Sequence, residues 1–179
     1  MLKKILTYLF FALLIIISGF ALRHFVLNPA VQSPATSTEA FFVASFPGLD
    51  GQLQPMAQWK GKIIIVNFWA TWCPPCLEEM PELSRVHAEY RDQGLVVLGI
   101  SSDELDKIRE FAQLTPVSYP LLSGDLDAMS LSESLGNNKG VLPYTAVIAP
   151  DGSIVKTYFG LVNQSLLEAT FLPLLGPRN

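Results

Sequence analysis

Cys73 and Cys76 are the residues whose type and spacing most plainly indicate chemistry. They are the only two cysteines among 179 residues, and two prolines separate them. A Cys-x-x-Cys pair that follows a buried strand and opens a helix is typical of a reversible dithiol and disulfide couple. The pair therefore predicts a redox-active site.

The two cysteines are expected to have different roles. Cys73 should lie at the N-terminal edge of a helix, with Pro74 at the first helical position, where a missing N–H costs nothing. Free N–H groups and the helix dipole stabilise an anion there and so lower the pKa of the thiol. We expect Cys73 to attack a substrate disulfide and Cys76, one turn on and less accessible, to resolve the mixed disulfide. Because Pro74 and Pro75 supply no amide donors to the thiolate, the couple should be reducing.

Glu79 is a candidate for handling the proton of Cys76. It lies three residues further along, so the two side chains share one face of the expected helix. A carboxyl group turned into the fold would have a raised pKa and could exchange a proton with the thiol. The alternative is that Glu79, like Glu78 and Glu82, only solvates the helix surface.

Other uses of the cysteine pair are less favoured. Two cysteines are half of a zinc site, but His24 borders an apolar segment and His87 lies roughly 16 Å beyond Cys76 along the same helix. A static disulfide in a binding module would stabilise little, because the closed loop is short. Peroxidase chemistry is disfavoured by the absence of an isolated peroxidatic cysteine pattern. We expect no metal ion and no cofactor besides the Cys73–Cys76 disulfide.

The elements around the cysteines predict an α/β domain, with helices packed on a central sheet. Apolar runs indicate buried strands over residues 62–69 and 94–100, and helical spacing indicates a helix from the cysteines to about Tyr90. Residues 101–104, Ser-Ser-Asp-Glu, are typical of a capping box that opens a helix. Residues 41–46 are interpreted as an edge strand.

The C-terminal half continues the alternation of helices and strands. A helix over residues 126–135 precedes a strand over residues 141–148, and Pro150-Asp151-Gly152 turns this strand into a partner over residues 153–159. Asn163 is a good N-cap for the last helix.

This order of elements resembles the thioredoxin fold, a mixed sheet flanked by helices. The resemblance is closer to the TlpA/ResA/DsbE-type membrane-anchored thiol-disulfide oxidoreductases. It is carried by VNFWATWCPPC at residues 66–76 and EMPEL at residues 79–83, within a similarity that covers roughly residues 41–175.

The resemblance implies roles for further residues. A glutamate at the place of Glu79 handles protons in this family, and thioredoxin proper has an aspartate where this chain has Asn67. Pro143 matches a proline whose peptide bond is cis beside the disulfide, which would leave the backbone of Leu142 free to pair with an extended substrate. Trp72 is expected to shield the sulfurs and to contact partners.

The resemblance also implies partners. Protein disulfides are the expected substrates, for example in cytochrome c maturation or metal-site assembly, and an integral-membrane protein of the DsbD/CcdA type is the expected electron donor. Disulfide oxidase or isomerase activity is the alternative among redox functions.

The N-terminus predicts a membrane anchor. Lys3 and Lys4 precede an uncharged, largely apolar run over residues 5–22, which is long enough as a helix to cross roughly 27 Å of a bilayer. The positive-inside rule favours a cytoplasmic N-terminus, and a cleaved signal peptide is the alternative. We expect an anchor at residues 1–25, a linker at 26–40 and the redox domain at 41–179, outside the cytoplasm and on the inner membrane.

Charge disfavours a nucleic-acid partner. The chain has 12 Lys and Arg residues against 16 Asp and Glu residues, a formal net charge of −4, and the excess of acid lies in the redox domain. Nucleic-acid binding requires a basic surface. We expect a monomeric domain that does not bind nucleic acid.

Overall fold

The computed structural model describes residues 13–14, 17–18 and 37–175. The chain separates into two units, residues 1–35 and 36–179. Most of the membrane segment expected at residues 5–22, and most of the linker expected at 26–40, lie outside the described residues. Within the described residues, no helix is long and apolar enough to cross a membrane.

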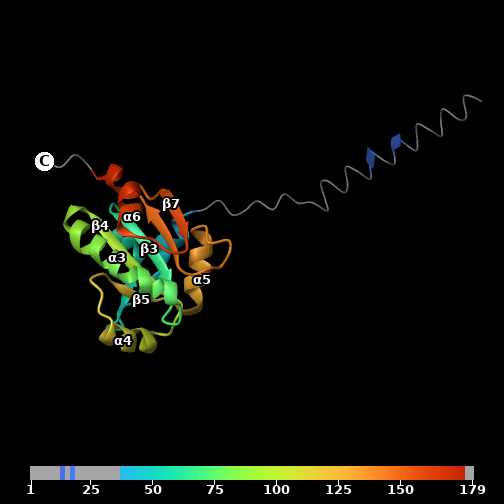
Figure 1. The fold of residues 1–179 in the computed structure, drawn as a ribbon. Coiled ribbons are helices and arrows are strands. Elements are labelled where there is room, and N and C mark those ends of the chain that lie inside the picture. Colours follow the sequence, from blue (N-terminus) through green and yellow to red (C-terminus); the bar gives the residue numbers. More distant parts are fainter. Residues whose placement is uncertain (1–12, 15–16, 19–36, 176–179) are drawn as a thin grey trace, which may run out of the picture. The chain divides into compact units, whose positions relative to one another are not determined.

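A five-stranded mixed sheet forms the centre of the second unit (Figure 1). The strand order is β5-β4-β3-β6-β7; β3, β4 and β5 are parallel, whereas β6 is antiparallel to β3 and β7 is antiparallel to β6. A separate hairpin consists of β1 and β2. The strands are β1 (Ser45–Pro47), β2 (Leu53–Pro55), β3 (Ile63–Trp69), β4 (Leu95–Ser101), β5 (Leu121–Ser123), β6 (Tyr144–Ile148) and β7 (Ile154–Phe159).

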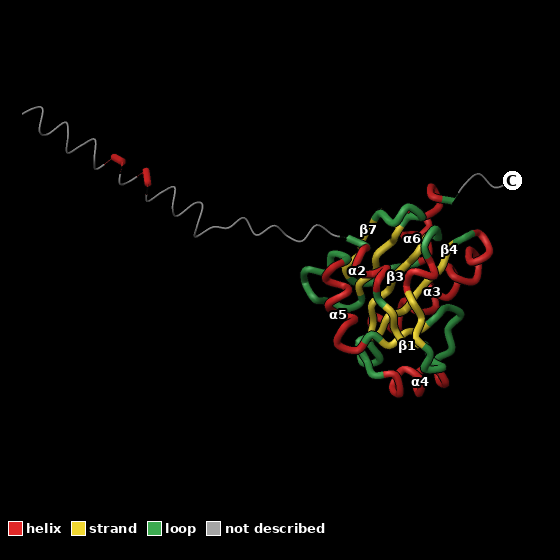
Figure 2. Tube along the Cα trace, turned by 180° about the vertical axis from the view of Figure 1, so that it is seen from behind, coloured by secondary structure: helices red, strands yellow, loops and turns green. Residues whose placement is uncertain are grey.

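Helices cover both faces of this sheet (Figure 2). They are α2 (Glu39–Val43), α3 (Pro74–Tyr90), α4 (Leu105–Leu114), α5 (Asp125–Ser134) and α6 (Gln164–Phe171), with the 3₁₀ turns η2 (Met56–Trp59), η3 (Arg91–Gln93) and η4 (Leu172–Leu174). The predicted α/β fold, a mixed sheet flanked by helices, is confirmed.

Strand β3 is buried on both faces because its side chains alternate between two cores. Ile65 and Trp69 pack with α3 and α6, in the same cluster as both cysteines. Val66 and Phe68 point the other way and pack with α2 and α5. The strand therefore ends beside the first turn of α3, which is where the cysteines lie.

Two local predictions were wrong. Residues 41–46 were expected to be an edge strand, but residues 41–43 end α2 and β1 begins only at Ser45. In a strand, Phe41 and Val43 would lie on the same face. Phe41 is instead fully buried, whereas Val43 is 78% exposed. Residues 101–104 do not form a capping box: Ser101 still belongs to β4, and Glu104, the N-cap of α4, makes no side-chain capping bond.

Other boundaries match closely. The helix that follows the cysteines ends at Tyr90, and the β6–β7 hairpin forms as expected. The side chain of Asn163 caps α6 by accepting a hydrogen bond from the N–H of Leu166 at 2.9 Å.

Candidate active site

The cysteines form a disulfide at the N-terminus of α3. Cys73 occupies the N-cap position and Pro74 is the first helical residue. The two Cα atoms are 5.3 Å apart. Cys73 retains 4% of its surface, whereas Cys76 has none exposed. The cysteine expected to attack a substrate is thus the one nearer to solvent.

An apolar groove of about 540 Å³ borders Cys73 of this disulfide. Trp72 forms part of its wall and is 69% exposed. Leu142 lies on the groove, and its peptide bond to the buried Pro143 is cis, as the resemblance implies. The lining residues come from the start of α3, α5 and the two loops beside them: Trp72, Cys73, Pro74, Pro75, Ser102, Met129, Gly140, Val141 and Leu142.

In the part of the chain that the structure describes, no charged side chain lines the groove. Its surface therefore suits an apolar stretch of polypeptide rather than a charged small molecule. Met129 contributes to it from α5, a helix that follows the cysteines by about fifty positions in the sequence. No motif singled out Met129, because only the packing of α5 against the sheet brings it to the groove.

Glu79 lies on the buried side of α3, with 1% of its surface exposed. Its Oε1 accepts a hydrogen bond from Asn67 Nδ2 at 2.6 Å, and its Oε2 accepts one from the N–H of Val162 at 2.9 Å. Burial raises the pKa of Glu79 from 4.5 to about 7, although both hydrogen bonds favour the ionised form. Glu79 is therefore not a solvated surface residue, and near pH 7 both of its protonation states are populated.

Two more residues with polar groups, Asn67 and Tyr119, are buried on this side of the sheet. Asn67 pairs with Gly99 on β4, and a Cβ at Gly99 would be 3.2 Å from Trp69 Nε1 and 3.0 Å from Tyr119 Cε2. Glycine suits this position because the two rings, and the Leu121 side chain at 2.8 Å, approach the strand so closely. Burial, with a smaller effect from the charge of Glu79, raises the pKa of Tyr119. Tyr119 was missed from the sequence, since it lies in a loop without a motif.

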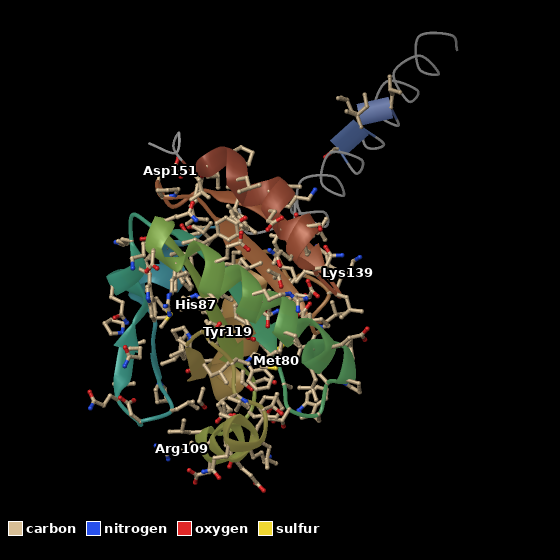
Figure 3. The ribbon with its side chains drawn as sticks, turned by 60° about the vertical axis from the view of Figure 1, so that its left-hand side comes forward. Met80, His87, Arg109, Tyr119, Lys139 and Asp151 are labelled. Carbon is tan, nitrogen blue, oxygen red and sulfur yellow. A yellow bond between two sulfur atoms is a disulfide. The ribbon has the colours of Figure 1, made fainter. Side chains whose placement is uncertain are left out.

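His87, the histidine weighed for a metal site, belongs to the core of the domain. Figure 3 shows it on the same helix as Met80, with Tyr119 close by. Its Nδ1 accepts a hydrogen bond from the N–H of Val97 at 3.2 Å, and the His87 and Tyr119 ring centroids are 6.5 Å apart. Burial, with the nearby charges of Arg91 and Lys62, lowers the pKa of His87, which favours the neutral ring.

The fold and the disulfide together define a thioredoxin-like protein. The chain belongs to the AhpC/TSA family, whose model matches residues 36–157. The thiol-disulfide oxidoreductase ResA of Halalkalibacterium halodurans is 28% identical over 130 residues, which cover 72% of this chain and 71% of that protein.

Solved structures give the same assignment. A thiol:disulfide interchange protein of the thioredoxin family from Chlorobium tepidum matches with a TM-score of 0.66 and 26% identity, over 80% of this chain and 96% of that one. An exposed lipoprotein thioredoxin from Streptococcus pneumoniae matches with a TM-score of 0.62 and 26% identity, over 73% of this chain and 98% of that one.

These comparisons confirm the resemblance and the class of enzyme, a thiol-disulfide oxidoreductase. Such an enzyme acts on disulfide-containing substrates. Of the residues expected to form the site, Trp72, Cys73 and Leu142 meet at the groove. Cys76, Glu79 and Pro143 are buried and do not line it. Their roles in catalysis stay predictions.

Proposed function

We propose that this protein reduces disulfides in extracytoplasmic proteins. The Cys73 thiolate attacks one sulfur of the substrate disulfide, forms a mixed disulfide and releases the other substrate sulfur as a thiolate. The Cys76 thiolate then attacks the Cys73 sulfur, which closes the Cys73–Cys76 disulfide and releases the second substrate thiolate. Two electrons pass to the substrate, and the enzyme disulfide must be reduced again by a donor dithiol.

The observation that carries this proposal is the difference between the two sulfurs. Cys73 adjoins an apolar groove, whereas Cys76 is closed off and lies on the helix face of a buried carboxyl group whose pKa is near neutrality. A substrate segment in the groove reaches Cys73 first. Glu79 then takes up the proton of Cys76 during resolution, and Trp72 and Leu142 contact the substrate beside the sulfur.

The reducing direction rests on the two prolines of the site. Pro74 and Pro75 offer no N–H to stabilise the Cys73 thiolate. The reduced form is therefore less stable than it would be with amide donors there, which makes the couple a better reductant. A strong oxidant of this kind has a reduction potential of about −120 mV. We expect the measured potential of this protein to lie well below that value. A value near −120 mV would instead favour the oxidase alternative.

The setting of the reaction is part of the same proposal. The apolar run over residues 5–22, with its preceding lysines, supports a single-pass anchor in the inner membrane and a redox domain in the periplasm or an equivalent space. A monomeric redox domain is part of the proposal. In that setting an integral-membrane donor of the DsbD/CcdA type would restore the dithiol. Proteins of cytochrome c maturation or metal-site assembly are the proposed substrates. No metal or further cofactor takes part.

Trapping of mixed disulfides tests the proposal. In cells that express the full chain with Cys76→Ser, Cys73 should retain covalent partners, which mass spectrometry can identify after non-reducing separation. The control is the Cys73→Ser, Cys76→Ser double variant, which should retain none. Partners that are equally abundant in the control, or none in either, would refute a reaction at Cys73.

Protease treatment of intact spheroplasts should digest the redox domain if it faces outward.

A further inference from the structure

The turn that carries Cys73 is fastened to the end of the neighbouring strand, β4. The N–H of Ser102 donates to the carbonyl of Trp69 at 3.1 Å. Two residues before Cys73, the N–H of Thr71 donates to Asp103 Oδ2 at 2.6 Å. The second bond is the shorter, and its acceptor is a side chain. The position of the turn therefore depends on how Asp103 is held.

Asp103 is itself held by two serines, with 4% of its surface exposed. The hydroxyl of Ser101 donates to Oδ2 at 3.1 Å and accepts from the N–H of Asp103 at 3.0 Å. The hydroxyl of Ser123, on β5, donates to the Asp103 carbonyl at 2.9 Å. Ser101 thus holds the carboxyl group of Asp103, whereas Ser123 holds only its backbone.

Among the residues that the structure describes, no cation pairs with this buried carboxyl group. The ion pairs among the described residues involve other acids, namely Glu82, Asp92 and Asp106. A buried acid without a cationic partner contributes little to stability, because its removal from water is costly. The carboxyl group instead accepts two hydrogen bonds from neutral donors, the Ser101 hydroxyl and the backbone N–H of Thr71.

We propose that Asp103 is a positioning residue of the redox site, which fixes Trp72 and Cys73 by holding the N–H of Thr71. This inference rests on the proposed function. Attack on a disulfide requires the entering sulfur to approach along the axis of the bond that breaks. A shift of about 1 Å in the attacking group can lower such a rate up to about 100-fold. Asp103 acts through the turn and does not touch the substrate.

Two substitutions separate position from charge. Asp103→Asn removes the negative charge but keeps a carbonyl oxygen that can accept from Thr71 and Ser101. Asp103→Ala removes both the charge and the acceptor. Because both variants lack the charge, any change in the pKa of Cys73 caused by its loss is common to them. A difference in rate between them therefore reports the hydrogen bond.

The probe is dithiobis(nitrobenzoate), a small aromatic disulfide, mixed with the fully reduced protein. Cys73 displaces one nitrothiobenzoate and forms a mixed disulfide, and Cys76 then displaces the second as the enzyme disulfide closes. Each release is coloured, so both steps are followed in a single turnover. Urea unfolding of each variant, and of Ser123→Ala as a matched control, measures stability separately. Ser123→Ala loses a hydrogen bond to the same residue but leaves the bond to Thr71.

The first release should be about tenfold slower in Asp103→Ala than in Asp103→Asn, and close to wild type in Ser123→Ala. Equal rates for the two Asp103 variants overturn the proposal, as does a Ser123→Ala rate as low as that of Asp103→Ala. If Asp103→Ala does not fold, Ser101→Ala serves instead, because it removes one support of the carboxyl group. It should slow the first release by about twofold to threefold. An unchanged rate overturns the proposal. A wild-type protein that is inert towards the probe contradicts the proposed function instead.

Discussion

Replacing Glu79 with glutamine tests how the buried site handles protons. The pKa of Glu79 is about 7, so at pH 7 roughly half of the folded molecules have the carboxylate that can accept the proton of Cys76. Glutamine has nearly the same shape but cannot accept a proton. The substitution should therefore slow the second step, closure of the enzyme disulfide, and leave the attack by Cys73 nearly unchanged.

The size of the effect follows from the pKa values. A general base contributes typically about 100-fold or more, but a thiol with an ordinary pKa of about 8.5 is already ionised to a few per cent at pH 7. We therefore expect the second step to slow by about tenfold at pH 7. In the wild type its rate should rise between about pH 5 and pH 8 with a midpoint near 7, the pKa of Glu79. In Glu79→Gln this midpoint should vanish and the rate should follow the thiol alone.

The two releases of nitrothiobenzoate from the reduced protein measure both steps in one experiment. Glu78→Gln is the matched control, because Glu78 precedes Glu79 on the same helix and is exposed. An unchanged second phase in Glu79→Gln, with the same dependence on pH, would refute the assigned role. Slowing of both steps to the same extent would indicate a general disturbance of α3 rather than loss of a base.

Three further outcomes are expected. The contribution of Glu79 to the free energy of unfolding should fall by about 3 kcal/mol as the pH rises from about 4.5 through 7, because the folded state keeps on Glu79 a proton that the unfolded state releases. This stabilisation is fully present below pH 4.5. Urea unfolding of Glu79→Gln at several pH values should lack this dependence on pH. Trp72→Ala should raise KM for a protein disulfide by about fivefold without lowering Tm, since the side chain is 69% exposed on the groove; an unchanged KM would exclude Trp72 from the contact surface. Asn163→Ala should cost about 1 kcal/mol in urea unfolding and leave the reaction rates unchanged, because the side chain caps α6.

The sequence could predict features that depend on nearby residues. The cysteine pair, the first turn of α3 with Pro74, and the cap at Asn163 all follow from short-range rules on spacing and backbone donors. The apolar runs predicted β3 and β4 to within one or two residues for the same reason. The spacing of Glu79 from Cys76 indicated a shared face but not its burial, since burial depends on what packs against α3.

The features that could not be predicted depend on contacts between distant segments. Residues 101–104 have the composition of a capping box, yet the side chains of Ser101 and Asp103 bond to each other, and Asp103 accepts from the N–H of Thr71, thirty-two positions earlier. Tyr119 lies close against β4 at Gly99, where a Cβ would be only 3.0 Å from its ring. Neither contact has a local sequence signature, and each arises from the parallel packing of β3, β4 and β5.

The pairing of Asn67 with Glu79 explains why one carboxyl group is enough for the proposed proton transfer. Asn67 Nδ2 donates to Glu79 at 2.6 Å and to Thr145 Oγ1 at 3.0 Å. An aspartate at position 67 would place two carboxyl groups within hydrogen-bond distance, and mutual repulsion would raise the pKa of one of them far above that of the other. The amide supplies a donor without a charge, so the pKa of Glu79 reflects burial opposed by two hydrogen bonds and stays near 7. A group half protonated at neutral pH can accept the proton of Cys76 when the disulfide closes and return it when a donor opens the disulfide again.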